Sequence, residues 1–266
     1  MMARTSSRRV SSTFFLFLLA APAACHAAQA AATTDMDTPA FVPPPPPPGS
    51  EMDHGDRAIF DATRKLKGTE RWALAAHDSD LATPALLDDF SCAAGFRLDA
   101  ARAPHLATLL ERMKVFIKPI VSTEKKHWHR NRPFVEMPEA PLCLARPPGE
   151  EPSFAYPSGH TTDGWATALL LARLMPERAT GIMERGRIFG ESRVVCGVHW
   201  ATDVWAGYMN GATLFSLFAS APDMAPLFAA AQADVAALAK TPAAPDPAIC
   251  RAEHNAAMSS PLTQTP

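Results

Sequence analysis

The sequence has almost no net charge and, past its N-terminus, no long apolar run. Its 25 lysines and arginines face 27 aspartates and glutamates, which leaves a formal net charge of −2. A chain so balanced has no cationic excess for nucleic acid or for an anionic membrane surface. The run Leu214 to Ala221 is apolar but much shorter than a membrane-spanning helix. These absences argue against a nucleic-acid-binding protein and against a membrane-spanning one.

Patterns typical of metal sites are also missing. No Cys-x2-Cys pair occurs, so the sequence does not indicate a zinc site. His127 and His129 are two positions apart, and side chains at that spacing diverge on a helix. We therefore predict that the protein uses no metal and no cofactor.

The N-terminus has the organisation of a secretory signal peptide. Three arginines precede a run of about a dozen mostly apolar residues at 13–24, and small residues follow it. We predict a signal peptide over residues 1–30 and a periplasmic or secreted protein. Ordinary Sec export is favoured, and Arg8-Arg9 suggests twin-arginine export as the alternative. Lipidation of Cys25 is disfavoured, because a proline stands where a lipobox has leucine.

Composition divides the rest of the chain into a linker, a domain and a tail. Six consecutive prolines at 43–48 favour a stiff, extended linker over residues 31–50. Roughly 235 residues remain after signal removal, which suits one domain with a substantial core. We place this domain at residues 51–253, and a flexible tail at residues 254–266.

Helical periodicity dominates the domain, and no stretch shows sustained apolar–polar alternation. Alanine, leucine, methionine, arginine and glutamate, all good helix formers, are abundant in the periodic segments. We therefore predict an all-α bundle. The expected helices are about 56–79, 84–93, 103–117, 120–131, 161–175, 177–193, 200–219 and 223–239.

Four cysteines lie outside the predicted signal peptide: Cys92, Cys143, Cys196 and Cys250. An even number in an exported chain favours disulfides, and four cysteines allow three pairings. Of these pairings, Cys92–Cys143 with Cys196–Cys250 is the one we expect.

Two segments offer cations and free amides. Lys125 and Arg132 are seven residues apart, nearly two helical turns, so both cations would lie on one helix face that ends before Pro133. Pro157-Ser158-Gly159-His160 reads as the start of a helix, where unpaired amides bind anions. His160 would then lie at the mouth of that anion site, placed to give a proton to a leaving oxygen.

A third segment, Ser192-Arg193-x5-His199-x3-Asp203, pairs a histidine with a carboxylate. At a spacing of four, Asp203 can accept the proton on Nδ1 of His199 and leave Nε2 free as a nucleophile. Arg193 adds another cation for phosphoryl oxygens. Each segment alone also fits a plainer interpretation, as a solvated basic face, a helix cap or an exposed His–Asp pair. Together they suit a phosphoryl group best.

The three segments resemble, position for position, the K-x6-RP, PSGH and SR-x5-H-x3-D signature of the type 2 phosphatidic acid phosphatase superfamily. The stretches around PSGH and SRVVCGVHW look like the bacterial class A nonspecific acid phosphatases in particular. The resemblance covers roughly residues 50 to 240. It implies a single-domain helical bundle of the phosphatase/haloperoxidase kind.

The resemblance also implies a role for each signature residue. His199 would attack phosphorus and form a phosphohistidine, His160 would protonate the leaving alcohol and then activate water, and Asp203 would orient His199. The phosphate-binding residues would be Lys125, Arg132, Ser158, Gly159 and Arg193. The implied enzyme is a metal-independent acid phosphatase acting on small organic phosphomonoesters. It would be inhibited by vanadate and by phosphate, and it could form a homo-oligomer.

Three alternative functions are compatible with the same motifs. A pyrophosphatase or lipid-phosphate phosphatase would share the chemistry with another substrate. A vanadium haloperoxidase would bind vanadate where the phosphoryl group sits, although such enzymes are much longer chains. A non-enzymatic phosphate-binding module would have no need for both His160 and His199.

Overall fold

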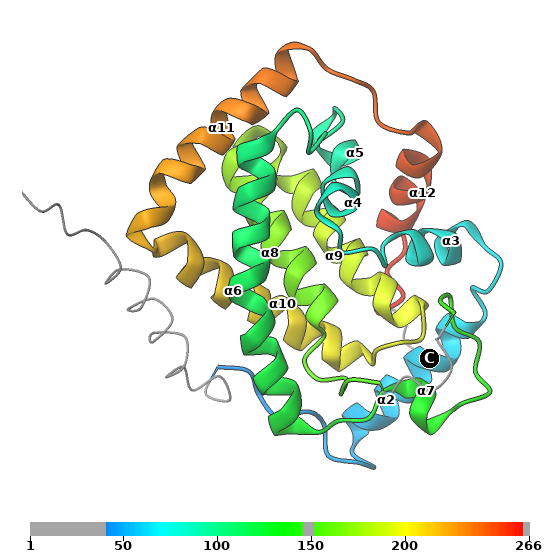
Figure 1. Ribbon diagram of the computed structural model, residues 1–266. Coiled ribbons are helices and arrows are strands. Elements are labelled where there is room, and N and C mark those ends of the chain that lie inside the picture. Colours follow the sequence, from blue (N-terminus) through cyan, green and yellow to red (C-terminus); the bar gives the residue numbers. More distant parts are fainter. Residues whose placement is uncertain (1–40, 146–151, 263–266) are drawn as a thin grey trace, which may run out of the picture. The chain divides into compact units, whose positions relative to one another are not determined.

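In the computed structural model, residues 41–145 and 152–262 are described, and they belong to one compact unit. Within these ranges the secondary structure is helical, and no strand occurs (Figure 1). The predicted all-α fold is therefore confirmed for the described residues. The predicted signal peptide lies outside them, as do residues 31–40 of the linker.

Three long helices form the centre of the fold. Helix α8 (Gly159–Leu174) packs against α9 (Ala179–Val195) and α10 (Ala201–Ser220), and α6 (Pro104–Trp128) packs against α11 (Ala225–Lys240) and α8 (Figure 1). The remaining α-helices are α2 (Glu51–Arg64), α3 (Glu70–His77), α4 (Thr83–Asp88), α5 (Ser91–Ala94), α7 (Pro133–Glu136) and α12 (Pro247–Ala257). Two short 3-10 helices, Pro176–Arg178 and Pro222–Met224, precede α9 and α11.

Glycine lets the first turn of α8 approach α10 closely. A Cβ atom at Gly207 on α10 would lie 2.9 Å from the carbonyl oxygen of Ser158 and 2.7 Å from the Cβ of Thr161. Any larger residue would push the two helices apart at the Pro157–His160 segment, which carries one of the sequence motifs. This close packing therefore fixes the position of the α8 N-terminus.

The predicted helix 84–93 is divided into α4 and α5, and two further predictions are wrong for reasons of local chemistry. The segment 56–79 divides into α2 and α3, because Gly68 adopts a left-handed conformation (φ +82°) between them. The predicted helices 103–117 and 120–131 are one helix, α6, although Pro119 lies inside it. Pro119 and Val115, whose carbonyl loses its partner, are both exposed, so water can satisfy the missing hydrogen bond.

The C-terminal boundary of the domain is later than predicted. Helix α12 continues to Ala257, and Ala256 is buried in a cluster with Leu74 and Ile188. At the other end of the domain, Val42 is buried, and the hydroxyl of Tyr156 donates to the carbonyl of Pro43 at 2.5 Å. The last residues of the proposed linker therefore contact the domain.

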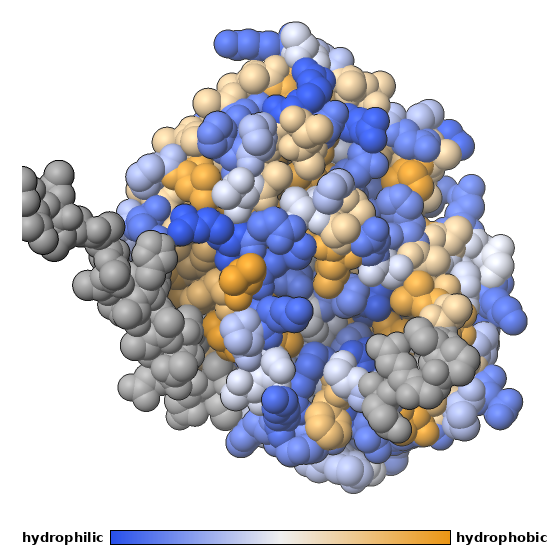
Figure 2. Space-filling model, in the orientation of Figure 1, coloured by the Kyte–Doolittle hydropathy of each residue, from blue (hydrophilic) through white to orange (hydrophobic). Residues whose placement is uncertain are grey.

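No single helix in the described ranges has the length and apolar character needed to cross a membrane; one pair, α10 with 222–240, meets that test together but is bent by 78°. The face drawn in Figure 2 is a mosaic of small hydrophilic and hydrophobic areas.

Two disulfides are present, and their pairing differs from the prediction. Cys92 pairs with Cys250, and Cys143 pairs with Cys196. The first bond joins α5 to α12, whose existence the sequence analysis missed. The second joins the 143 loop to the end of α9, where the amide of Cys143 also donates to the carbonyl of Cys196 at 3.1 Å.

Removing the Cys92–Cys250 bond should destabilise the protein more than removing Cys143–Cys196. The bonds close loops of 158 and 53 residues, and the chain-entropy difference between these loops is about 1 kcal/mol. We expect Cys92→Ala/Cys250→Ala to lose about 2–5 kcal/mol of unfolding free energy in urea, with Cys143→Ala/Cys196→Ala as the matched comparison. Peptide mapping without reductant that finds Cys92 joined to Cys143 would refute this pairing.

Candidate active site

The cations of the first motif come together without sharing a helix face. Helix α6 ends at Trp128, and His129 turns the chain in a left-handed conformation (φ 49°). Lys125 lies in the last turn of α6, and its Nζ donates to the carbonyls of Phe154 at 2.6 Å and Ala155 at 3.2 Å. The expectation of one shared helix face is therefore wrong, because the chain folds back after α6.

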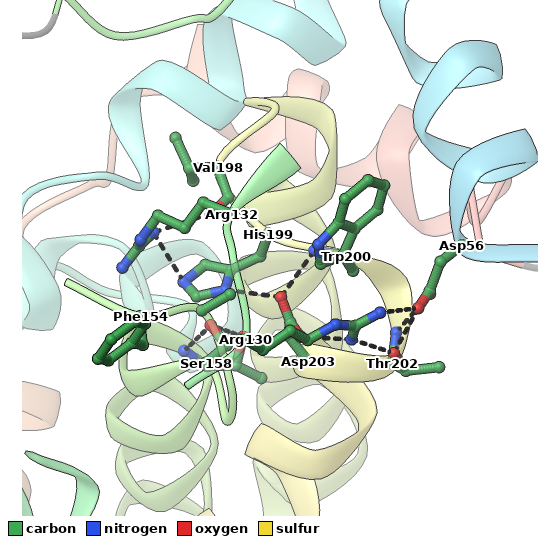
Figure 3. A network of polar contacts seen from close by, with 12 residues as sticks. Asp56, Arg130, Arg132, Phe154, Ser158, Val198, His199, Trp200, Thr202 and Asp203 are labelled. Atoms are coloured by element: carbon green, nitrogen blue, oxygen red, sulfur yellow. Dashed lines mark hydrogen bonds and ion pairs between the residues drawn. The ribbon is translucent and has the colours of Figure 1, made fainter. Parts of the chain in front are cut away.

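Arg132 lies in the turn before α7 and reaches the third motif. Its Nε donates to the carbonyl of Ser153 at 2.7 Å, and one Nη donates to the carbonyl of Val198 at 2.9 Å. The same Nη lies 3.2 Å from Nε2 of His199 (Figure 3). Arg132 therefore brings a fixed positive charge directly beside the imidazole.

The second motif begins α8, as predicted. Ser158 is the N-cap residue, and its Oγ accepts from the amide of Thr161 at 3.4 Å and from the Thr161 hydroxyl at 2.9 Å. Ser158 is fully buried, whereas Gly159 lines the cavity described below. Ser158 therefore caps the start of α8, and Gly159 is the residue of this turn that faces the cavity.

The predicted His–Asp pair is present. Nδ1 of His199 lies 3.1 Å from Oδ2 of Asp203, and the same oxygen accepts from the amide of Trp200 at 2.9 Å (Figure 3). His199 precedes α10, and Asp203 lies in the first turn of that helix. Since the aspartate accepts the Nδ1 proton, the lone pair of His199 is on Nε2, which faces Arg132.

Sequence reasoning missed the arginine that binds Asp203. Arg130 donates to Oδ1 of Asp203 at 2.7 Å, to Oδ2 of Asp56 on α2 at 2.7 Å, and to the Thr202 hydroxyl at 2.6 Å (Figure 3). Asp56 also accepts from the amide of Thr202 at 2.9 Å. In the sequence, Arg130 is one of several basic residues near the end of α6. Its role depends on a partner 73 residues away, so local patterns carry no signal for it.

His160 is held from the far side of its ring. Its Nε2 lies 3.1 Å from the carbonyl oxygen of Ser79, just after α3. Because a carbonyl only accepts, Nε2 carries a proton, and Nδ1 is the nitrogen that can exchange one with a ligand. The carbonyl of Ser79 therefore fixes the His160 ring, and Nδ1 is the nitrogen left to exchange a proton with a ligand in the cavity.

Arg193 is a buried cation with unused donors. It lies in the last turn of α9 and is 3% exposed, and its Nε and one Nη have no hydrogen-bond partner among the described residues. Unpaired buried donors are costly unless a ligand accepts from them. The neighbouring Ser192 hydroxyl contacts Asp78 and the carbonyl of Ile188, which fixes this end of α9.

A cavity of about 430 Å³ is lined by some of these groups. At one end it is lined by Lys125, Arg132, Gly159, His160 and His199. Burial, followed by the charges of Arg132, Lys125 and Arg193, lowers the pKa of His199 well below its usual value. Burial and the same cations also lower the pKa of His160 well below its usual value.

The surroundings of Lys125 and Arg193 disfavour the charged forms of these two residues. Burial and Arg132 lower the pKa of Lys125 to about 7, and burial lowers the pKa of Arg193 to about 9. Burial raises the pKa of Asp203 to about 6, although Arg130 favours its charged form, so Asp203 is a carboxylate at neutral pH. An oxyanion bound among these cations would oppose the shifts on the lysine, the arginine and His160.

One group among the described residues has the geometry to hold a metal ion: His77, Asp78 and Asp89. Arg185 donates to both carboxylate oxygens of Asp78, at 2.5 and 3.3 Å, and its Nη2 lies 3.6 Å from Asp89. His77 and Asp89 are 2.9 Å apart, and hydrogen bonding by Asp78 and Asp89 raises the pKa of His77 to about 10, although burial acts in the opposite direction. The aspartates are therefore already matched by cations of the protein, and the group does not line the cavity.

Comparison with known proteins finds a family similarity. The PAP2 superfamily model matches residues 108–225, which include all three motifs. This segment is therefore similar to the PAP2 superfamily, in agreement with the resemblance seen in the motifs.

Relatives of this chain include acid phosphatases. The chain is 47% identical over 162 residues to an acid phosphatase of Zymomonas mobilis, covering 60% of this chain and 61% of that protein. It is 36% identical over 157 residues to a non-specific acid phosphatase of Providencia stuartii, covering 59% and 63%. The matches thus span about three fifths of the length of these relatives. A solved transmembrane PAP2-type phosphatidylglycerolphosphate phosphatase from Bacillus subtilis is 20% identical, covers 75% of this chain and 94% of its own, and has a TM-score of 0.45.

The charge state of the two histidines can be tested directly. We expect nitrogen NMR at about pH 6, in phosphate-free buffer, to show both rings neutral, with the proton on Nδ1 in His199 and on Nε2 in His160. Adding phosphate should raise the pKa of His160, because a dianion offsets the cations that disfavour the imidazolium. Fully protonated rings without phosphate, or no response of His160 to phosphate, would contradict this electrostatic account.

Proposed function

We propose that this protein is a metal-independent acid phosphatase that hydrolyses phosphomonoesters through a phosphohistidine on His199. One observation carries the proposal: Nδ1 of His199 is bound by Asp203, while Nε2 faces a cavity beside Arg132. An imidazole fixed in this tautomer is a ready nucleophile toward a bound phosphoryl group. The acid phosphatase relatives and the similarity to the PAP2 superfamily support the same activity.

Substrate binding would place the phosphoryl oxygens among the cations. Lys125 and Arg132 line the cavity, Arg193 has unused donors, and the amide of Gly159 lies at the N-terminus of α8. These groups supply the charge stabilisation that a metal ion supplies in other phosphatases. The bound dianion also favours protonation of His160, which prepares the proton donor.

The first chemical step would transfer the phosphoryl group to the protein. The Nε2 lone pair of His199 forms a bond to phosphorus, while the bond from phosphorus to the ester oxygen breaks. The leaving oxygen takes the proton from Nδ1 of His160, because Nε2 of that ring is bound to the Ser79 carbonyl. Asp203 stabilises the positive charge that forms on His199.

The second step would release phosphate. Nδ1 of His160, now without its proton, takes a proton from water as the water oxygen bonds to phosphorus and the P–Nε2 bond breaks. This returns both histidines to their starting states. Since His160 must enter the cycle protonated and His199 neutral, activity should favour the acid side of neutral pH.

The proposal includes export to the periplasm or the medium. The predicted signal peptide supports it, and so do the two disulfides, because such bonds persist mainly in oxidising compartments. Inhibition by vanadate and by phosphate follows from the same cationic cavity, since both are tetrahedral oxyanions.

The roles of His199 and His160 can be distinguished by comparing substrates with two different leaving groups. His199→Ala removes the nucleophile, so kcat/KM should fall about equally for propyl phosphate and for p-nitrophenyl phosphate. His160→Ala removes the proton donor, which a propoxide needs and a nitrophenolate hardly needs. We therefore expect a loss of about 10²- to 10⁴-fold on propyl phosphate and a much smaller one on p-nitrophenyl phosphate.

His105→Ala is the matched control, because this exposed histidine contacts Asp234 and does not line the cavity. It should leave both substrates unaffected. Equal losses on the two esters in His160→Ala, or a leaving-group dependence in His199→Ala, would reverse the assigned roles.

A further inference from the structure

The cavity continues past the groups that would bind phosphate. Its other end is lined by Leu81, Lys114, Ile117, Lys118 and Asp163. Helices α6 and α8 run antiparallel there: at Gly159 the near side chains are Val121 and Lys125, and at Asp163 the nearest cations are Lys114 and Lys118. An ester with its phosphoryl group near His199 would therefore extend its leaving group between these helices.

Asp163 is unusual among the residues at this end. Its Oδ1 is buried and has no hydrogen-bond partner among the described residues. Burial raises the pKa of Asp163 to about 7, against the opposite effect of Lys114 and Lys118. An apolar residue would be more stable in such surroundings, since an unsatisfied buried acceptor is costly. No described residue donates a hydrogen bond to this buried oxygen, whereas a ligand in the cavity can.

The position of Asp163 fits a contact to the leaving group. It lies three residues after His160 on α8, and side chains at this spacing are about 5–6 Å apart at Cβ. The ester oxygen would lie at His160, the proton donor. A group two to four bonds farther along the leaving alcohol would then meet Asp163.

The charges at this end favour a neutral, hydroxyl-bearing leaving group. A leaving group with an ammonium would meet Asp163 but also the two lysines, and one with a second phosphate would meet the carboxyl group. Lys114 already donates to Thr83 and Glu111, at 3.3 and 3.2 Å, whereas Lys118 has no such acceptor among the described residues. A hydroxyl can donate to Asp163 and accept from Lys118 at once.

We propose that Asp163 and Lys118 form a leaving-group subsite that selects phosphomonoesters of sugars and other polyols. This inference rests on the proposed phosphatase function and names the substrate class of that same site. Asp163 acts as the acceptor for a leaving-group hydroxyl, and Lys118 as the donor.

The test compares glycerol 1-phosphate with propyl phosphate, which share a three-carbon chain and differ in two hydroxyls. We measure the ratio of kcat/KM for the two esters in the parent protein and in Asp163→Leu, which removes the acceptor and keeps the branching of the side chain. The ratio should fall about 3- to 10-fold, the effect of losing a hydrogen bond to an uncharged group, because the raised pKa keeps Asp163 largely protonated on the acid side of neutral pH. Asp163→Leu should not lower the unfolding temperature, which separates a specificity role from a structural one.

Asp61→Leu is the control, because it removes an exposed carboxylate on α2, outside the cavity. Its ratio should match that of the parent protein. A ratio changed by less than twofold in Asp163→Leu would overturn the proposal. So would a selective loss on 2-aminoethyl phosphate, which would mark an ammonium subsite, or a selective loss on propane-1,3-diol bisphosphate in Lys118→Ala, which would mark an anion subsite.

A binding measurement tests the Asp163–Lys118 subsite independently of the proposed phosphatase function. In a His199→Ala background, calorimetry gives the affinity ratio of glycerol 1-phosphate to propyl phosphate without any turnover. If the parent protein hydrolyses neither ester, the proposed function fails, and the calorimetric ratio with and without Asp163→Leu still decides the subsite.

Discussion

The carboxylate of Asp203 is the contact on which the rest of the site depends. It binds Nδ1 of His199 and the Trp200 amide through one oxygen, and Arg130 through the other. Through Arg130 it reaches Asp56 on α2, and its own backbone carbonyl accepts from the Ser158 amide at 3.0 Å. One residue therefore ties the nucleophile to α2, α8 and α10. Removing one partner of such a buried pair typically costs about 3–5 kcal/mol, so this network serves both the fold and the chemistry.

The side of the His199 ring opposite Asp203 faces a cluster of positive charges. Lys125, Arg132 and Arg193 converge there; burial and the charge of Arg132 lower the pKa of Lys125 and of Arg193, and Arg193 keeps unused donors. Such an arrangement is unfavourable for the free protein and favourable once a dianion binds. The same binding event raises the proton affinity of His160. In the proposed mechanism, the cluster would couple substrate binding to protonation of His160.

The sequence predicted the local features and failed on contacts between distant segments. The His199–Asp203 spacing, the helix start at Ser158 and most long helices are local patterns, and the structure has them. Nothing local indicates that Arg130 reaches Asp56 and Asp203, or that Cys92 meets Cys250 across 158 residues. Pro119 suggested a break that its exposed position makes unnecessary. Asp163 looked like part of a helix start, and only the cavity around it shows that its carboxyl group lacks a partner.

The central claim is that His199 forms a covalent bond to phosphorus. The most direct measurement is to mix the protein with labelled phosphomonoester, quench it in alkaline detergent, and map the label by peptide mass spectrometry. The account predicts phosphate on His199, in larger amount in His160→Ala, because water activation is slowed there. Label on His160 or on another residue, or steady turnover with no covalent phosphate in either protein, would contradict it.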